Sequence, residues 1–323
     1  MSGGTVHSLV LESEFEVRLG SWLRALPQLQ SLSIEAARLT LGASLSQLQG
    51  LTRLSMSCMD ASKMYPSDRE QHFISLPNDA LPPTLQTLCL QHFVGSTLPL
   101  HTMPVLPALR SLELHCPKDG NLQLGWLSAY TQLTTLHLSG CTMPEIPVQL
   151  TMLTALEELE LESAGLQGEE NVLAPLSALQ KLTTLSLADN RLKGLPAAVL
   201  SLPALQDLNI EKNDMKASLP LSSSVMTRLL LDENTVKASA EQLTGLVALH
   251  TLEIAENEDA WRFTTEDAAK ILKSLRALPH FKLLDAESLY GEPHPLYIAR
   301  EVLDALELHP FIILACDEAN DDW

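Results

Sequence analysis

A thiol, a carboxylate and an imidazole recur at equal spacing in the first half of the chain. Cys89, Glu113 and His137 follow one another at intervals of 24 residues. Together these side-chain types can bind a soft metal ion or form a reactive cysteine beside a base. Polar residues on an exposed strand face are also ordinary, and any regular repeat aligns them without chemistry. The spacing therefore gives a weak candidate site, and the sequence otherwise predicts no metal, no cofactor and no catalytic residue.

Carboxylates dominate the corresponding positions further along the chain. If each segment is a short strand, the residues two, four and six places after its first apolar position share one face. Neighbouring strands lie ~4.8 Å apart, so the acidic residues on that face would form a ridge of like charges, which repel one another. We interpret the ridge as a surface for a basic partner, made by Glu158, Glu160, Glu162, Asp207, Glu211, Asp232 and Glu253.

These residues depend for their placement on a repeated pattern of apolar residues. The segment LTTLSLADNRL, which begins at Leu182, is its clearest copy, and LQDLNIEKNDM from Leu205 and LTTLHLSGCTM from Leu133 are close variants. Anchored on the first apolar residue, nine of the eleven intervals between successive copies lie between 21 and 26 residues. A fixed period in this range is typical of a solenoid of stacked repeats.

One repeat contains two kinds of segment. In LTTLSL, Leu185 and Leu187 lie two residues apart, which places them on one face of a strand and Ser186 on the other. Apolar residues three and six places before the anchor, such as Leu150 and Leu153 before Leu156, predict a helical or 3-10 return segment with one buried face. A single repeat cannot bury its own leucines, so neighbouring repeats must stack.

The pattern resembles the LxxLxLxxNxL consensus of leucine-rich repeat proteins over essentially the whole chain. Phrases such as EIPVQLTMLTALEELEL (145–161) are most similar to ribonuclease-inhibitor-like or plant-type intracellular members. The resemblance implies an α/β fold: a right-handed, horseshoe-like solenoid of about twelve repeats, with a parallel sheet on its concave face and helical or 3-10 segments on its convex face. It also implies a binding module rather than an enzyme.

The consensus asparagine, whose amide bonds the backbone of adjoining turns, is present in four consecutive repeats. We expect a structural ladder from Asn190, Asn213, Asn234 and Asn257, with Cys141 as the common substitute earlier in the array. Earlier repeats carry residues there that cannot make these bonds, such as Ala37 and Phe93.

The repeats predict one solenoid domain over 1–323. Its first repeats span 6–56, a long polar loop spans 57–84, regular repeats span 85–260, and helical C-terminal repeats or a cap span 261–323. Within the last part, Thr264 or Thr265 before two acidic residues and an apolar stripe predicts a capped amphipathic helix. A further helix is expected over 295–308.

Composition limits the partner and the compartment. The formal net charge is −19, of which −16 falls in 151–323. Such a charge repels phosphate backbones and anionic lipid, so we expect neither nucleic-acid binding nor membrane insertion. Five widely spread cysteines and a start without a signal-peptide pattern favour a reducing, cytoplasmic location, with the cytoskeleton or the ciliary axoneme as a possible address.

The sequence thus predicts a protein–protein interaction scaffold that is not an enzyme and that binds a basic protein on its concave face. One alternative is a structural or anchoring subunit of a cytoskeletal or axonemal assembly. Another is the recognition part of an immune-type or ubiquitin-ligase receptor, which would need a separate effector domain. The oligomeric state does not follow from the sequence, and acid that only solubilises a leucine-rich solenoid is the competing explanation of the charge.

Overall fold

The computed structural model describes residues 5–41, 45–58, 74–75, 81–91, 105–115, 124–168, 170–215, 217–255, 264–287 and 312–316. The chain forms two compact units. The N-terminal unit comprises Met1–Met143 and Pro147–Gly165, and the C-terminal unit comprises Pro144–Ile146 and Leu166–Trp323. The predicted loop over 57–84 and the predicted helix over 295–308 lie largely or wholly outside the described residues.

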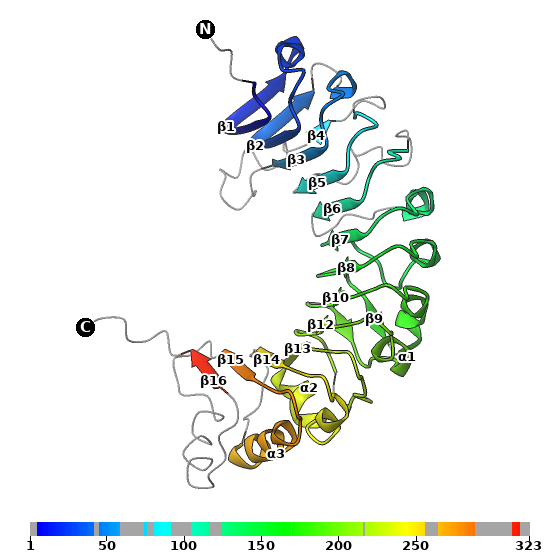
Figure 1. The fold of residues 1–323 in the computed structure, drawn as a ribbon, viewed down its shortest axis with the longest axis vertical. Coiled ribbons are helices and arrows are strands. Elements are labelled where there is room, and N and C mark those ends of the chain that lie inside the picture. The colour runs from blue at the N-terminus through cyan, green and yellow to red at the C-terminus, as the bar shows by residue number, and fades with distance from the viewer. Residues whose placement is uncertain are drawn as a thin grey trace, which may run out of the picture. The chain divides into compact units, whose positions relative to one another are not determined.

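The N-terminal unit is built on a parallel sheet to which successive repeats add strands (Figure 1). The strands pair in the order β1–β2–β3–β5–β6–β7–β8, and β4 pairs with β2. They span Ser8–Leu19 (β1), Ser31–Leu41 (β2), Arg53–Cys58 (β3), Ile74–Ser75 (β4), Thr87–Gln91 (β5), Ser111–His115 (β6), Thr135–Ser139 (β7) and Glu158–Glu160 (β8). Short 3-10 helices return the chain between strands: Ser21–Ala25 (η1), Leu45–Gln47 (η2), Leu124–Ala129 (η5) and Val148–Met152 (η6).

Alternating burial explains why these segments are strands. In β6 and β7, Leu112, Leu114, Leu136 and Leu138 are fully buried while the residues between them are half-exposed. The register pairs buried positions with buried positions and open positions with open positions, since Leu112 lies opposite Leu136 and Glu113 opposite His137. Leucines of the return segments, such as Leu150, close the core from the other side. One sheet face is therefore apolar and covered, and the other is polar and open.

The C-terminal unit repeats this plan with more helix. Its main strands pair in the order β10–β12–β13–β14–β15–β16, and β9 pairs separately with β11. The strands span Gln167–Gly168 (β9), Thr184–Ser186 (β10), Arg191–Leu192 (β11), Asp207–Asn209 (β12), Arg228–Asp232 (β13), Thr251–Ala255 (β14), Leu283–Glu287 (β15) and Ile312–Cys316 (β16). Its helices are Glu170–Ala178 (η7), Ala197–Leu200 (α1), Glu233–Ala238 (α2), Gln242–Gly245 (η8) and Thr265–Arg276 (α3).

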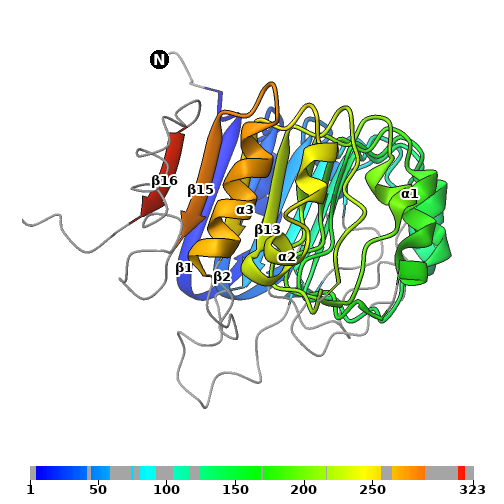
Figure 2. The same ribbon diagram turned by 90° about the horizontal axis from the view of Figure 1, so that it is seen from below.

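Helices α2 and α3 lie against one face of the C-terminal unit's sheet (Figure 2). The predicted amphipathic helix is confirmed as α3, and Thr264 is its N-cap. The Thr264 hydroxyl accepts from the Asp267 backbone N–H at 3.2 Å, and Asp267 Oδ2 accepts from the Thr264 N–H at 3.1 Å. This reciprocal capping box satisfies two N–H groups that a helix start leaves unpaired. Ala268, Ile271, Leu272 and Leu275 form its buried stripe.

Two asparagines make the predicted ladder. Asn190 Oδ1 accepts from the Leu166 N–H at 3.0 Å, while its amide donates to the carbonyl oxygens of Leu187 and Ala188. Asn213 repeats this one turn later, where Oδ1 accepts from the Leu192 N–H at 3.1 Å. Its amide donates to three carbonyl oxygens at 2.9–3.1 Å. These bonds join adjoining repeats of the C-terminal unit. The parallel register and the recurring buried leucines show a leucine-rich-repeat solenoid in both units.

The other predicted ladder members differ. Asn234 lies in the first turn of α2, because a helix begins there directly after β13, and its side chain makes no ladder bond to any described residue. Cys141 is fully buried and disulfide-bonded, and the side chain of its partner lies outside the described residues. Its sulfur nevertheless occupies the place of the ladder amide, 4.0 Å from the Leu114 carbonyl oxygen and 3.7 Å from that of Ser139. Asn257 lies outside the described residues.

Candidate functional site

The structure aligns the three residues of the weak metal or catalytic candidate without bringing them into one site. Cys89 lies opposite Glu113 on β5 and β6, and Glu113 lies opposite His137 on β6 and β7. The strand alternation points Cys89 to the open face, yet its small side chain is only 8% exposed because longer neighbours cover it. His137 instead contacts carboxylates on β8, the next strand.

The environment of Cys89 keeps its thiol protonated. Burial, and then the charge of Glu113, raise the pKa of its thiol to about 11. The nucleophile in cysteine chemistry is the thiolate, and at pH 8 such a thiol is only roughly one part in a thousand ionised. The environment of Cys89 therefore opposes a reactive or catalytic role.

We expect Cys89 to resist alkylation in the folded protein. Iodoacetamide at pH 8 should modify it at least about tenfold more slowly than in the denatured chain, because both access and thiolate fraction are reduced. Peptide-resolved mass spectrometry over time measures the rate at this residue alone. Equal rates in the folded and denatured protein would show that the thiol is open and ionisable.

Glu113 is held by its neighbours. Gln91 Nε2 donates to Glu113 Oε1 at 3.0 Å, and His115 Nε2 lies 2.7 Å from the same oxygen. Burial is the largest single influence on the pKa of Glu113 and raises it. The bonds from His115, Gln91 and Cys89 together outweigh burial, so that the pKa lies below its usual value. Glu113 is therefore an ionised carboxylate with its acceptor positions largely engaged.

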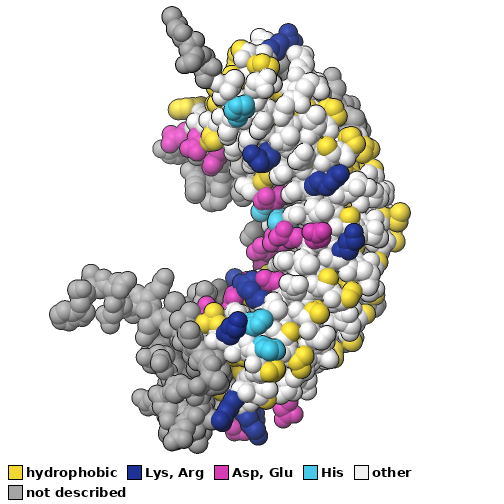
Figure 3. Space-filling model, in the orientation of Figure 1, with side chains coloured by type: hydrophobic (Ala, Val, Ile, Leu, Met, Phe, Trp, Pro, Cys, Tyr) yellow, Lys and Arg dark blue, Asp and Glu magenta, His cyan; other side chains and the backbone are white. Residues whose placement is uncertain are grey.

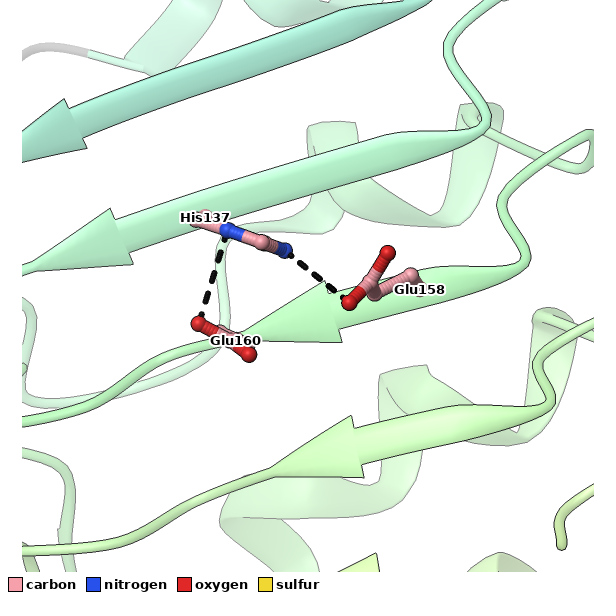
Figure 4. A group of neighbouring side chains, drawn as sticks. All are labelled: His137, Glu158 and Glu160. Atoms are coloured by element: carbon pink, nitrogen blue, oxygen red, sulfur yellow. Dashed lines mark ion pairs between the residues drawn. The ribbon is translucent and has the colours of Figure 1, made fainter. Parts of the chain in front are cut away.

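His137 lies between two carboxylates of the neighbouring strand (Figure 4). It pairs in register with Glu160, and Glu158 lies two residues before Glu160 on β8. Its Nδ1 is 3.5 Å from Glu160 Oε2, and its Nε2 is 3.4 Å from Glu158 Oε1. The Nε2 contact is within ion-pair distance but lacks hydrogen-bond geometry, so Nε2 is buried without a hydrogen-bond partner.

Acidic charge exceeds basic charge around His137. We define the acidic face as the open face of β6–β8 and the residue just beyond it, made by Glu113, His115, His137, Glu158, Glu160 and Glu162. Among the described side chains, no Lys or Arg forms an ion pair with Glu158, Glu160 or Glu162. Partial burial raises the pKa of Glu160; His137 opposes this, while the carboxylates of Glu158, Glu162 and Glu113 add to it. Acidic and histidine side chains gather there in the space-filling view (Figure 3).

The predicted acidic residues of the C-terminal unit have a different environment, which depends on Arg228 of β13. Its guanidinium donates to Glu253 through Nε and Nη2 at 2.7 and 2.8 Å, and to Asp207 through Nη1 at 3.0 and 3.2 Å. These bonds, first from Glu253 and then from Asp207, raise the pKa of Arg228 further above its usual value. Asp207 and Glu253 therefore stabilise three adjacent strands and offer less charge to a partner. Glu211, which follows β12, is half-buried.

Asp232 is not a surface residue, contrary to the ridge prediction. It is 0% exposed and caps α2, where its Oδ1 accepts from the N–H and the hydroxyl of Thr235, both at 2.8 Å. The strand alternation places Asp232 outward, but β13 ends there and the chain turns directly into α2. The side chain therefore turns inward to satisfy the helix start, and burial raises the pKa of its carboxyl.

Sequence reasoning missed two features of this surface. It assigned His137 to a column with Cys89 and Glu113, and Glu158 and Glu160 to a separate acidic column, although the same position count places them on adjacent strands. It also left out Arg228, which stands two places after the anchor Met226 and so shares the outward position of Asp207. Reading the outward columns together would have found both groups.

Comparisons with known proteins return structural similarity only. No family model matches the chain, and no curated protein matches it. Among solved structures, an internalin (InlF) of Listeria monocytogenes is similar over 86% of each chain, with 18% identity and a TM-score of 0.46. An internalin C2 of the same organism is similar over 74% of this chain and 85% of that chain, with 20% identity and a TM-score of 0.38. The fold assignment therefore rests on the register and the asparagine bonds of this chain.

The described helices include none that combines the length and the apolar composition needed to cross a lipid bilayer.

Proposed function

We propose that this protein is an interaction scaffold whose acidic face binds a basic segment of another protein. One observation carries the proposal: Glu158 and Glu160 lie on the open face of β8 and Glu162 lies just beyond it. The ion-pairing neighbour of Glu158 and Glu160 is His137, and no described Lys or Arg forms an ion pair with any of the three. Carboxylates crowded in this way repel each other. A partner that brings Lys or Arg relieves that repulsion and gains attraction at the same time.

The geometry fits an extended basic segment. Glu158 and Glu160 are alternate residues of one strand, so their Cα atoms lie about 6.6 Å apart, and the neighbouring strands lie ~4.8 Å away. Alternate residues of an extended peptide have the same spacing as Glu158 and Glu160. Lys or Arg at every second position of the partner would therefore meet successive carboxylates along the sheet.

The C-terminal unit contributes less to this proposal. Asp207 and Glu253 are already bonded to Arg228, and Asp232 is buried in the cap of α2. From the predicted ridge we therefore retain Glu158, Glu160 and Glu162 as the binding residues. The cytoplasmic location and the absence of enzyme activity remain predictions, and the pKa of Cys89 opposes the one catalytic candidate.

The test compares the wild type with a Glu158/Glu160/Glu162→Lys variant. Both proteins are used to capture partners from source lysate, and each captured partner is then purified and titrated against both. Three partly exposed ion pairs contribute up to ~1 kcal/mol each, so the variant should lose about a hundredfold in affinity. Wild-type affinity should also fall steeply as salt is raised.

A charge-matched control separates this face from net charge. Glu145, Asp214 and Glu241 are exposed residues outside the acidic face, and their replacement by Lys changes the net charge equally. The control should bind like the wild type. If both triple variants lose affinity together, or if binding is insensitive to salt, the acid serves solubility and the proposal is wrong.

A further inference from the structure

His137, Glu158 and Glu160 form a compact group of metal-ligand side chains. One ligand atom from each residue lies within 4.8 Å of the other two. They come from directly paired positions of β7 and β8, where the backbone register fixes His137 opposite Glu160. The parallel pairing of β7 with β8 thus holds the three Cα atoms in place, and only side-chain rotation is needed to bring the ligand atoms together.

The distances within the group match a coordination shell better than hydrogen bonds. Two ligands of a tetrahedral zinc ion, each ~2.0–2.1 Å from the metal, lie about 3.4 Å from each other. His137 Nε2 and Glu158 Oε1 are 3.4 Å apart. That nitrogen is buried and has no hydrogen-bond partner among the protein atoms. A buried polar atom without a partner calls for an explanation, and coordination to a metal ion would supply one.

The surroundings also favour a cation. The side chains of Glu158 and Glu160 are 40% and 38% exposed, so an ion can reach them from solvent. The two carboxylates stand on alternate residues of one strand, where like charges repel each other, and a divalent ion bound between them would relieve that repulsion. One imidazole with two carboxylates suits a first-row transition ion more than Ca²⁺ or Mg²⁺, which prefer oxygen ligands alone.

We propose that His137, Glu158 and Glu160 bind one divalent transition-metal ion of the zinc class. Three protein ligands leave a fourth position open in a tetrahedral shell. That position can take water or a ligand atom from another molecule. This site shares His137 with the Cys89, Glu113 and His137 column that the sequence suggested, but its two other ligands come from β8.

The test titrates metal-free wild-type protein with ZnCl₂ by isothermal calorimetry and with CoCl₂ by visible absorption. We expect one Zn²⁺ per chain and a Co²⁺ spectrum of tetrahedral intensity. Removal of even a supporting group typically weakens metal binding ~10–100-fold. His137→Ala and Glu160→Gln remove ligands, so each should weaken Zn²⁺ binding at least tenfold. The wild-type protein should bind Ca²⁺ far more weakly than it binds Zn²⁺.

Matched controls use the same residue types elsewhere. His250→Ala changes a histidine whose ring lies 6.1 Å from that of His280, and Glu145→Gln changes an exposed carboxylate. Neither should alter Zn²⁺ affinity, and metal-free thermal unfolding should be similar for all four variants. The proposal is overturned if His137→Ala binds Zn²⁺ like the wild type, if a control loses the site, or if Ca²⁺ binds as tightly as Zn²⁺.

This inference goes beyond partner binding, and the two can fail separately. Metal binding is measured on the isolated protein, whereas the basic partner is measured with EDTA present. Carboxylates that fail to bind Zn²⁺ can still attract a basic segment. Conversely, if Zn²⁺ does bind, partner binding measured with EDTA still reports on the metal-free protein.

Discussion

Asn213→Ala is expected to lower the free energy of unfolding by about 3 kcal/mol. The Asn213 side chain accepts from the Leu192 N–H and donates to the carbonyl oxygens of Leu187, Ile210 and Glu211. It is 6% exposed, so water cannot replace these bonds. A buried donor or acceptor left without a partner costs ~1–3 kcal/mol, and alanine removes the partner of the Leu192 N–H and weakens the others together. Chemical denaturation followed by circular dichroism measures the loss.

The same repeat supplies the matched control. Asn209 is half-buried on the open sheet face, and its Oδ1 accepts a hydrogen bond from the Glu211 N–H at 3.0 Å. Because solvent can replace this bond, Asn209→Ala should cost less than about 1 kcal/mol. If the two alanine variants were equally destabilised, burial of the ladder would not be what makes Asn213 important. If neither were destabilised, the ladder would not stabilise this solenoid.

The apolar core was predictable from sequence because its signal is redundant. Each leucine position recurs in every repeat, so an error at one copy is corrected by its neighbours. The register that places Leu112 beside Leu136 follows from repeat length alone. The capping box at Thr264 was predictable for a different reason, since its residues lie within one turn of each other and need no tertiary information.

The burial of Asp232 shows why counting strand positions can fail to predict which side chains are exposed. Counting outward positions assumes that a strand continues until its last counted residue, but α2 begins at Glu233, directly after β13. A helix start needs an acceptor for its free N–H groups, and Asp232 supplies it from a buried position. Asn234 is displaced from the ladder by the same early helix. Both differences therefore have one local cause, the start of α2 directly after β13, which the consensus of the repeats does not show.

The pairing of charged side chains was harder to predict from the sequence than the packing of the core. The sequence placed Asp207 and Glu253 on the open face, but their pairing with Arg228 depends on side-chain reach across two strands. The same applies to His137, whose two nitrogens face carboxylates of β8. Net acidity alone treats all these residues alike. The structure separates a neutralised group in the C-terminal unit from an unneutralised one in the N-terminal unit, and this separation supports our choice of binding residues.

Gly245→Ala is expected to destabilise the C-terminal unit by about 3 kcal/mol. Gly245 ends η8, where its carbonyl oxygen accepts from the Ser223 N–H at 3.1 Å and the next residue bridges Ser223. A Cβ there would overlap the Leu221 carbonyl oxygen and lie 3.4 Å from Ser222 Cα. Both neighbours are backbone, so the segments must separate and the bridge must weaken. Overpacking of this kind typically costs ~1–3 kcal/mol, and backbone contacts place Gly245 at the upper end.

Two other glycines turn this expectation into a ranked series measured by the same denaturation experiment. A Cβ at Gly50 would lie 3.2 Å from the Leu29 carbonyl oxygen and 3.3 Å from that of Pro27, whereas a Cβ at Gly125 would meet nothing within 4 Å. Gly50→Ala should therefore cost about 1 kcal/mol. Gly125→Ala should be neutral or slightly stabilising, because alanine restricts the unfolded chain. A neutral Gly245→Ala would mean that the chain near Leu221 yields without cost, and that close stacking of neighbouring repeats does not limit the residue at this position.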